Sequence, residues 1–131
     1  MSMTWNSFSR VALAFLWIVA VLPAEAQSPV AKDADQPLVV IVHVDIIPPS
    51  TDAAVVLLKN YRQDSLKEAG VKRVEVLQQV GRPNHFTLVE EWENQAAYDH
   101  HVSAPATIQF RTRIAPMLGS PFDERLHRSI E

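Results

Sequence analysis

The sequence predicts a single α+β domain in which strands and helices follow one another in the order β-α-β-β-α-β. Three observations predict it. A run rich in β-branched residues, LVVIVHVDII, stops at two prolines, and a stretch with helical spacing then runs to a glycine. Two alternating segments next flank a short turn. The chain has 131 residues, 47% hydrophobic and 21% charged, a composition typical of one ordinary globular domain.

The first strand and the first helix are predicted over 38–70. Residues 38–47 are mostly apolar at both odd and even positions, which predicts a strand covered on both faces. Ser50 or Thr51 can cap the helix that follows, and Gly70 can end it after about 18 residues. Its apolar stripe is predicted at Ala54, Leu57, Leu58, Tyr61 and Ser65.

The middle of the chain predicts a hairpin. Residues 71–80 alternate in polarity and predict the second strand, 81–84 form a turn cluster with the letters GRPN, and 85–93 predict the third strand. Along the third strand, the period of two places four side chains on one face. They are Phe86, Leu88, Glu90 and Trp92.

The last part of the chain predicts a helix, a second helical stretch and a final strand over 122–130. Asn94 can cap the first of these helices, Pro105 ends or kinks it, and the second stretch runs to about Met117. The inward stripe of the capped helix is predicted at Ala97, Tyr98, His101 and Val102. The element order is that of the ferredoxin-like fold, an antiparallel four-stranded sheet with its helices on one face.

A homodimer is expected from the first strand. If both faces of 38–47 are buried, the sheet face opposite the helices needs a cover. A second copy of the same sheet is the simplest cover, because most soluble homo-oligomers pair identical surfaces.

The first 26 residues are expected to be a secretory signal peptide. Arg10 precedes an apolar run over 11–22, and 24–26 offer a small-x-small cleavage site. The residues over 27–37 then form a flexible leader, and 38–130 form the domain. A membrane anchor is the alternative, but the apolar run is short of the roughly 20 residues needed to cross a bilayer. We expect a secreted, periplasmic protein without a membrane anchor after cleavage.

The composition excludes several functions. With a net charge of −3 and scattered basic residues, neither nucleic acid nor an anionic membrane is an expected partner. The chain has no cysteine, which excludes disulfides and thiolate chemistry. Of the five histidines, His100 and His101 are adjacent and point about 100° apart on a helix, so no metal site is predicted.

Glu90 is the sharpest candidate for chemistry. Its predicted position places a carboxylate on a buried apolar face, where it needs a partner. His101, on the inward stripe of the next helix, is one such partner, and the two would form a base with an orienting carboxylate. A structural hydrogen bond that ties the helix to the sheet is the alternative. Trp92 and Tyr98 suit either the core or the wall of a site. His43 and Asp45 share a face of the first strand, which is a pocket face or the dimer interface, and a hydrogen-bonded structural pair is the favoured interpretation.

The segment FTLVEEWENQAAYDHHVSAPATIQF resembles the antibiotic biosynthesis monooxygenase family, including its quinol monooxygenase members. The matching features are Glu90, Trp92, the Ala97-Tyr98 pair, His101 and Pro105, and SPFDERLHR resembles the family's last strand. The resemblance implies a dimeric α+β barrel, with a pocket between helices and sheet. It also implies oxygenation of a quinol or polycyclic phenol by molecular oxygen, without a metal, flavin or other cofactor.

The resemblance implies roles for six residues. His101 is the expected catalytic base and Glu90 orients it; an imidazole suits this task because it changes charge near neutral pH. The expected substrate-binding residues are Trp92, Tyr98, Phe86 and His43.

The chain departs from the family at two points. Many members carry a second histidine and an aromatic residue where this chain has Ala106 and Thr107. The haem-degrading relatives have an asparagine on the first strand, absent from 38–47, and Trp and His near the positions of His101 and Arg111 here. Haem degradation is therefore not expected. A non-catalytic barrel that binds a small ligand, or serves only as structure, is the competing function.

Overall fold

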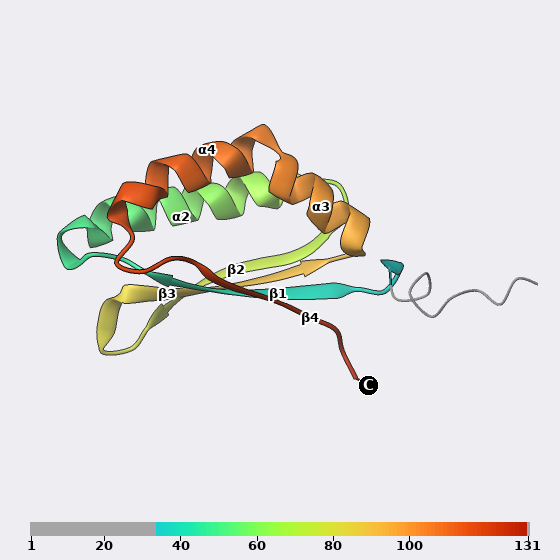
Figure 1. The fold of residues 1–131 in the computed structure, drawn as a ribbon, viewed down its shortest axis with the longest axis horizontal. Helices are drawn as coiled ribbons and strands as arrows, with labels where there is room; N and C mark the ends of the chain where they lie inside the picture. The colour runs from blue at the N-terminus through green and yellow to red at the C-terminus, as the bar shows by residue number, and fades with distance from the viewer. Residues whose placement is uncertain (1–33, 131) are drawn as a thin grey trace, which may run out of the picture.

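The computed structural model describes residues 34–130 (Figure 1). The predicted signal peptide over 1–26 and most of the leader lie outside the described residues. In chain order the elements are β1 (Leu38–Asp45), η1 (Pro48–Ser50), α2 (Thr51–Ser65), β2 (Val71–Gln79), β3 (Arg82–Trp92), α3 (Gln95–Ser103), α4 (Pro105–Ile114), η2 (Ala115–Met117) and β4 (Asp123–His127).

The four strands form one antiparallel sheet in the order β2-β3-β1-β4. The helices α2, α3 and α4 all lie on one face of it, with α2 and α4 side by side (Figure 1). This is the ferredoxin-like α+β arrangement that the element order predicts. Among residues 34–130, no helix is long and apolar enough to span a membrane.

The core fills the space between the sheet and the helices. On β1, alternate residues from Leu38 to Val44 are buried. The neighbouring strand in the sheet, β3, contributes the four side chains that were predicted to share one face. The predicted stripe of α2 is confirmed, because its five members are the buried residues of that helix. The two periodicities, two along strands and 3.6 along helices, therefore locate the core.

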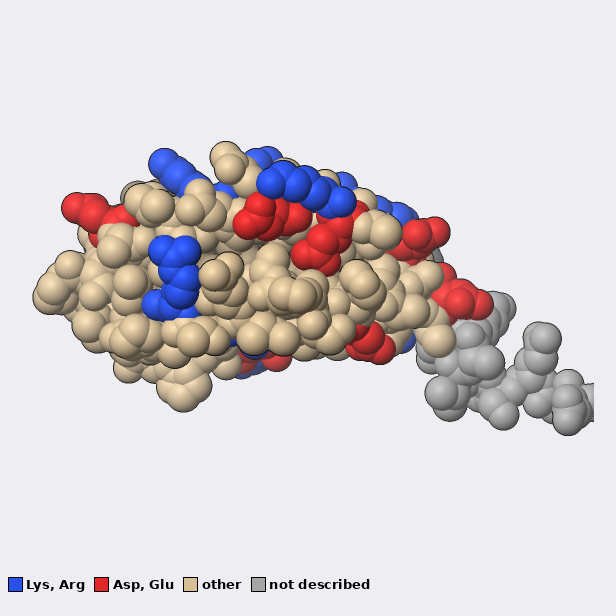
Figure 2. All heavy atoms as spheres, turned by 90° about the horizontal axis from the view of Figure 1, so that it is seen from above, with Lys and Arg blue, Asp and Glu red and all other residues tan. Residues whose placement is uncertain are grey.

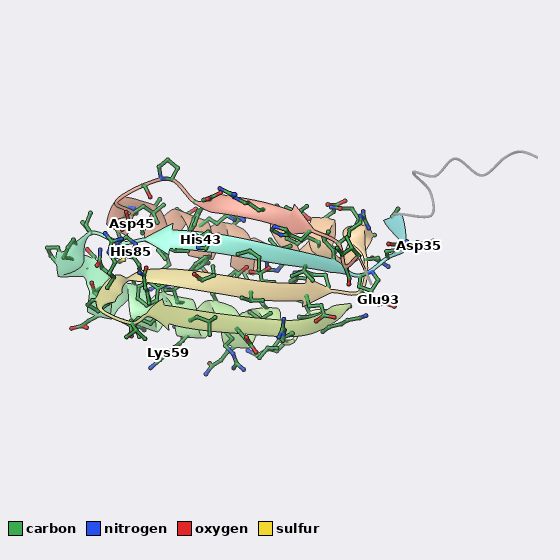
Figure 3. All side chains as sticks on the ribbon, turned by 90° about the horizontal axis from the view of Figure 1, so that it is seen from below. Asp35, His43, Asp45, Lys59, His85 and Glu93 are labelled. Atoms are coloured by element: carbon green, nitrogen blue, oxygen red, sulfur yellow. The ribbon has the colours of Figure 1, made fainter. Side chains whose placement is uncertain are left out.

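Among residues 34–130, all three α-helices lie on one face of the sheet and none covers the opposite face. Val39 and Ile41 are partly exposed there and His43 is exposed, so within one chain β1 is buried on one face only. Figure 3 views this face from below. Its expected cover by a second copy stays a prediction.

Two turns differ from the expected ones. α2 ends at Ser65 after 15 residues, because the amides of Lys67 and Glu68 bond to the carbonyls of Asp64 and Ser65 in turns tighter than those of an α-helix. The hairpin turn is Val80-Gly81 and β3 already begins at Arg82, so the cluster over 81–84 is mostly strand. Val80, predicted as the last residue of the second strand, lies in the turn and is accordingly exposed.

The C-terminal elements also differ in detail. β4 covers Asp123–His127, shorter than the predicted 122–130. Val102 is 37% exposed rather than inward, because it lies a further 100° around α3 from His101. Pro105 begins α4, as the prediction that it ends the preceding helix requires.

Candidate functional site

Four ionisable side chains meet between α2, β3 and α3. Glu90 and His101 are each 1% exposed and Tyr61 is 7% exposed. Glu68 follows the end of α2, and its side chain is 15% exposed. We call this set the polar cluster. It lies inside the helix-covered half of the domain, where an unpaired charge would be costly.

The Tyr61 hydroxyl lies between Glu90 and His101, the two residues predicted to form a pair. Its oxygen lies 2.5 Å from Oε1 of Glu90 and 2.8 Å from Nε2 of His101. The direct distance from Nε2 of His101 to Oε2 of Glu90 is 3.9 Å, too long for a hydrogen bond. Oε2 of Glu90 instead accepts from Nε1 of Trp92 at 3.1 Å. The structure thus brings His101 and Glu90 together, with a tyrosine between them that the sequence reasoning missed.

Glu68 is the main partner of the second ring nitrogen of His101, Nδ1. Nδ1 of His101 lies 3.0 and 3.1 Å from the two carboxylate oxygens of Glu68, and 3.3 Å from Oγ1 of Thr107. The ring also stacks on Trp92, with centroids 4.5 Å apart. Both ring nitrogens of His101 therefore have protein partners. His101 itself lies in the last turn of α3.

Local sequence signals place these side chains. Asn94 caps α3 by accepting from the amide of Ala97 at 2.9 Å, which fixes where the helix starts and turns Tyr98 and His101 inward. Tyr61 lies on the buried stripe of α2. Glu68 lies further on, in the tight turns beyond the end of α2, where helical spacing gives no direction, so no local pattern of the sequence identifies it.

Burial raises the pKa of Tyr61 well above its usual value, and the neighbouring carboxylate of Glu90 raises it further. Tyr61 therefore stays neutral near pH 7. A neutral hydroxyl has one proton to donate and lone pairs to accept with. It can thus connect Glu90 to His101 in either direction.

A narrow groove between α2 and α4 reaches the polar cluster. Its volume is about 50 Å³, enough for water-sized molecules and too small for an aromatic ring. Ala106 and Thr107, where the chain departs from the family, both line it. The lining includes Tyr61, Ser65, Glu68, Ala106, Thr107 and Arg113. Figure 2 shows acidic and basic side chains interspersed on this helical side, without one continuous basic patch.

The other predicted substrate-binding residues lie apart from the groove. Phe86 is buried and borders a hollow between α2 and β2. His43 is on the opposite face of the sheet, where Nδ1 contacts Oγ1 of Thr87 at 3.2 Å, and it lines a hollow of about 280 Å³ with Asp45 and His85 (Figure 3). The structure does not bring His43 or Phe86 to the polar cluster.

Tyr98 belongs to a second, partly buried network that ties β4 to the helices. Its hydroxyl donates to Oε1 of Glu124, and Arg111 donates to Oε2 of the same carboxylate at 2.5 Å. Arg111 also lies over the ring of Phe122. Tyr98 therefore contributes its hydroxyl to this network, while its ring lies 6.1 Å from the His101 ring.

The Glu124 network predicts a loss of stability in acid. Burial would raise the pKa of Glu124, but hydrogen bonds from Tyr98 and Arg111 outweigh it and hold the pKa below the usual value. A lowered pKa stabilises the fold above the unfolded value of about 4.3, and this part is lost as pH falls through the folded pKa. Thermal unfolding at pH 3–6 should therefore depend less on pH in Glu124→Gln. Equal slopes in wild type and Glu124→Gln would contradict this account.

Comparisons with known proteins identify the family. The sequence model of the family described as antibiotic biosynthesis monooxygenase matches residues 37–113, more than half of the chain. The chain belongs to this family. An uncharacterised protein of Synechocystis is 24% identical over 123 residues, which cover 92% of this chain and 84% of the relative.

Solved structures share the fold. A Nitrosomonas europaea protein, named provisionally as an antibiotic biosynthesis monooxygenase, matches with a TM-score of 0.70 at 20% identity, over 73% of this chain and 92% of the other. Rv0793 of Mycobacterium tuberculosis matches with a TM-score of 0.70 at 19% identity, over 73% and 97% of the two chains. At these identities the structures show the fold alone.

Among the described residues, no three His, Asp or Glu side chains are arranged to hold a metal ion. The expectation that the protein works without a metal or another cofactor stays a prediction.

Proposed function

We propose that this protein is a secreted monooxygenase that oxidises a quinol or polycyclic phenol with molecular oxygen and without a cofactor. The family supports an oxygenase. The observation that carries the proposal is the polar cluster, because it gives a buried base several partners that can share a proton. The signal-peptide pattern over 1–26 supports secretion.

Oxidation of a hydroquinone by oxygen requires few functional groups from the protein. A hydroquinone that has lost a proton can pass electrons to oxygen itself, so the site needs to hold the ring, take the proton and exclude water. In the overall reaction one oxygen atom of O₂ enters the product and the other leaves as water. The substrate supplies all four electrons, two by oxidation to the quinone level and two by hydroxylation.

The polar cluster suits the proton-taking step. Protonated His101 would lie between the carboxylate of Glu68 and the Tyr61 hydroxyl, which itself donates to Glu90. The stacked ring of Trp92 adds a favourable face for a cation. An aromatic substrate is larger than the groove, so α2 and α4 must move apart to admit it.

A homodimer is part of the proposal. The helix-free face of the sheet carries the apolar side chains of Val39, Ile41, Leu77 and Val89, and Leu77 is 49% exposed. A second sheet packed there would bury them and complete a barrel with two sheets. Light scattering of the purified protein measures whether it has twice the monomer mass.

Oxygen uptake tests the proposed activity. The protein over 27–131 is mixed with hydroquinones or polycyclic phenols in the presence of a chelator, and uptake is measured above the rate of autoxidation. We expect His101→Ala to lower the rate about 10²–10⁴-fold, the usual range for loss of a side chain that takes part in acid–base catalysis. His100→Ala is the matched control, since this neighbouring histidine is exposed and should be dispensable.

A binding or structural role is the second candidate. It is favoured by the completeness of the polar cluster, because no buried side-chain nitrogen or oxygen among residues 34–130 lacks a hydrogen-bond partner. Such a cluster can serve only to tie helices to sheet. Folded wild-type protein that consumes no oxygen with any substrate would overturn the proposed activity and favour this second role.

A further inference from the structure

We propose that Glu68 is the residue that takes the proton from the substrate, and that His101, Tyr61 and Glu90 behind it form a proton relay that shares the charge. The role of Glu68 toward a substrate rests on the proposed function. The relay does not, and it can be tested in the resting protein.

Exposure identifies Glu68 as the outer end of the cluster. Its side chain is 15% exposed and lines the groove, whereas the His101 side chain is 1% exposed. Neither ring nitrogen of His101 is free, since Nδ1 faces Glu68 and Nε2 faces Tyr61. A proton from a molecule in the groove therefore meets the carboxylate of Glu68 before it can reach the imidazole.

Counting protons defines two arrangements of the relay. In the first, Tyr61 donates to Glu90, and a doubly protonated His101 donates from Nε2 to Tyr61 and from Nδ1 to Glu68. In the second, the proton on Nε2 has moved to the oxygen of Tyr61, and the original tyrosine proton has moved to Oε1 of Glu90. Both arrangements hold three protons and a total charge of −1, so two short proton transfers convert one into the other.

The charge on Glu68 decides between the arrangements. A charged Glu68 lies 3.0 Å from Nδ1 and favours the imidazolium form, which Trp92 also supports by donating to the charged Glu90. When Glu68 takes a proton, the imidazolium loses one of its two counter-charges. The relay then shifts to the second arrangement, and with the added proton on Glu68 all four side chains of the polar cluster are neutral. A buried site avoids separated charges in this way.

The relay gives His101 a spectroscopic signature. The ¹⁵N chemical shifts of an imidazole distinguish the imidazolium from each neutral form. At pH 7 we expect wild-type His101 to be protonated on both nitrogens. In Glu68→Gln, which keeps the shape and removes the charge, we expect a proton on Nδ1 only, with Nε2 accepting from Tyr61. The control is Glu93→Gln, an exposed glutamate elsewhere in the fold (Figure 3), which should leave the His101 signals unchanged.

The same variants separate the relay from the activity. Unchanged His101 signals in Glu68→Gln would overturn the relay, whatever the activity. With an active wild type, we expect oxygen uptake to fall at least 100-fold in Glu68→Gln and to persist in Glu93→Gln. Full uptake in Glu68→Gln would overturn its role as proton acceptor. A wild type that consumes no oxygen would overturn the proposed function and, with it, the substrate role of Glu68, while the ¹⁵N signals would still decide the relay.

Discussion

Replacement of Trp92 by alanine is expected to lower the free energy of unfolding by about 3–5 kcal/mol, the usual cost of deleting a large buried aromatic side chain. Trp92 is 0% exposed and pairs across the sheet with Leu38 on one side and Val71 on the other. Its ring stacks on His101 and its indole N–H donates to Glu90. The variant would leave a cavity beside the polar cluster and remove one partner of a buried carboxylate.

Trp92→Phe separates these two contributions. It keeps most of the ring and removes the N–H donor, so we expect a smaller loss of about 1–3 kcal/mol, the cost of an unmet hydrogen bond with a charged partner. Urea unfolding followed by circular dichroism measures both variants. Equal losses in Trp92→Ala and Trp92→Phe would show that the hydrogen bond, rather than the packed ring, dominates.

Replacement of Gly70 by alanine is expected to lower the free energy of unfolding by about 2–6 kcal/mol. Two costs combine. The residue has φ of +80°, a conformation that strains L-residues by about 1–3 kcal/mol. A Cβ at this position would lie 2.5 Å from Cβ of Ala97, so α3 or the turn would have to shift, at a further cost of about 1–3 kcal/mol.

Gly81 offers the matched control. Its φ is +79°, but a Cβ there meets nothing within 4 Å. Gly81→Ala should therefore show the backbone cost alone, and the difference between the two variants measures the contact between Gly70 and α3. Thermal and urea unfolding of both proteins provide the comparison. If Gly70→Ala were no less stable than Gly81→Ala, the contact with Ala97 would be relieved by a shift of α3 that does not lower the free energy of unfolding.

The periodicity of the sequence alone predicts that Glu90 and His101 both face the interior between sheet and helices. Glu90 lies two residues from Leu88 and from Trp92 on a strand, which fixes its face, and Asn94 fixes the start of α3 and hence the direction of His101. The same rule already placed His43 elsewhere. It alternates with Val42 and Val44, so it faces away from the helices once those valines are buried.

The two side chains that hydrogen-bond to this pair, Tyr61 and Glu68, were not predictable in the same way. Tyr61 was expected in the core, and its spacing does not distinguish an apolar contact from a hydroxyl that bridges two ionisable groups. Glu68 lies beyond the end of α2, in tight turns where helical spacing no longer gives a direction. A glutamate at a helix end is also most often exposed. Its contact with His101 depends on how α2 and α3 pack together, which no local pattern records.

The strand order sets the sequence of events when the chain folds. β2 and β3 are joined by a two-residue turn and can pair as soon as both exist. β1 is made first, yet it lies between β3 and β4, so it has no partner until the hairpin is complete. β4 closes the far edge only when the last residues arrive. The apolar first strand therefore has no hydrogen-bonded neighbour while the chain is being synthesised. Its unpaired edges are the place where wrong pairing with another chain would begin.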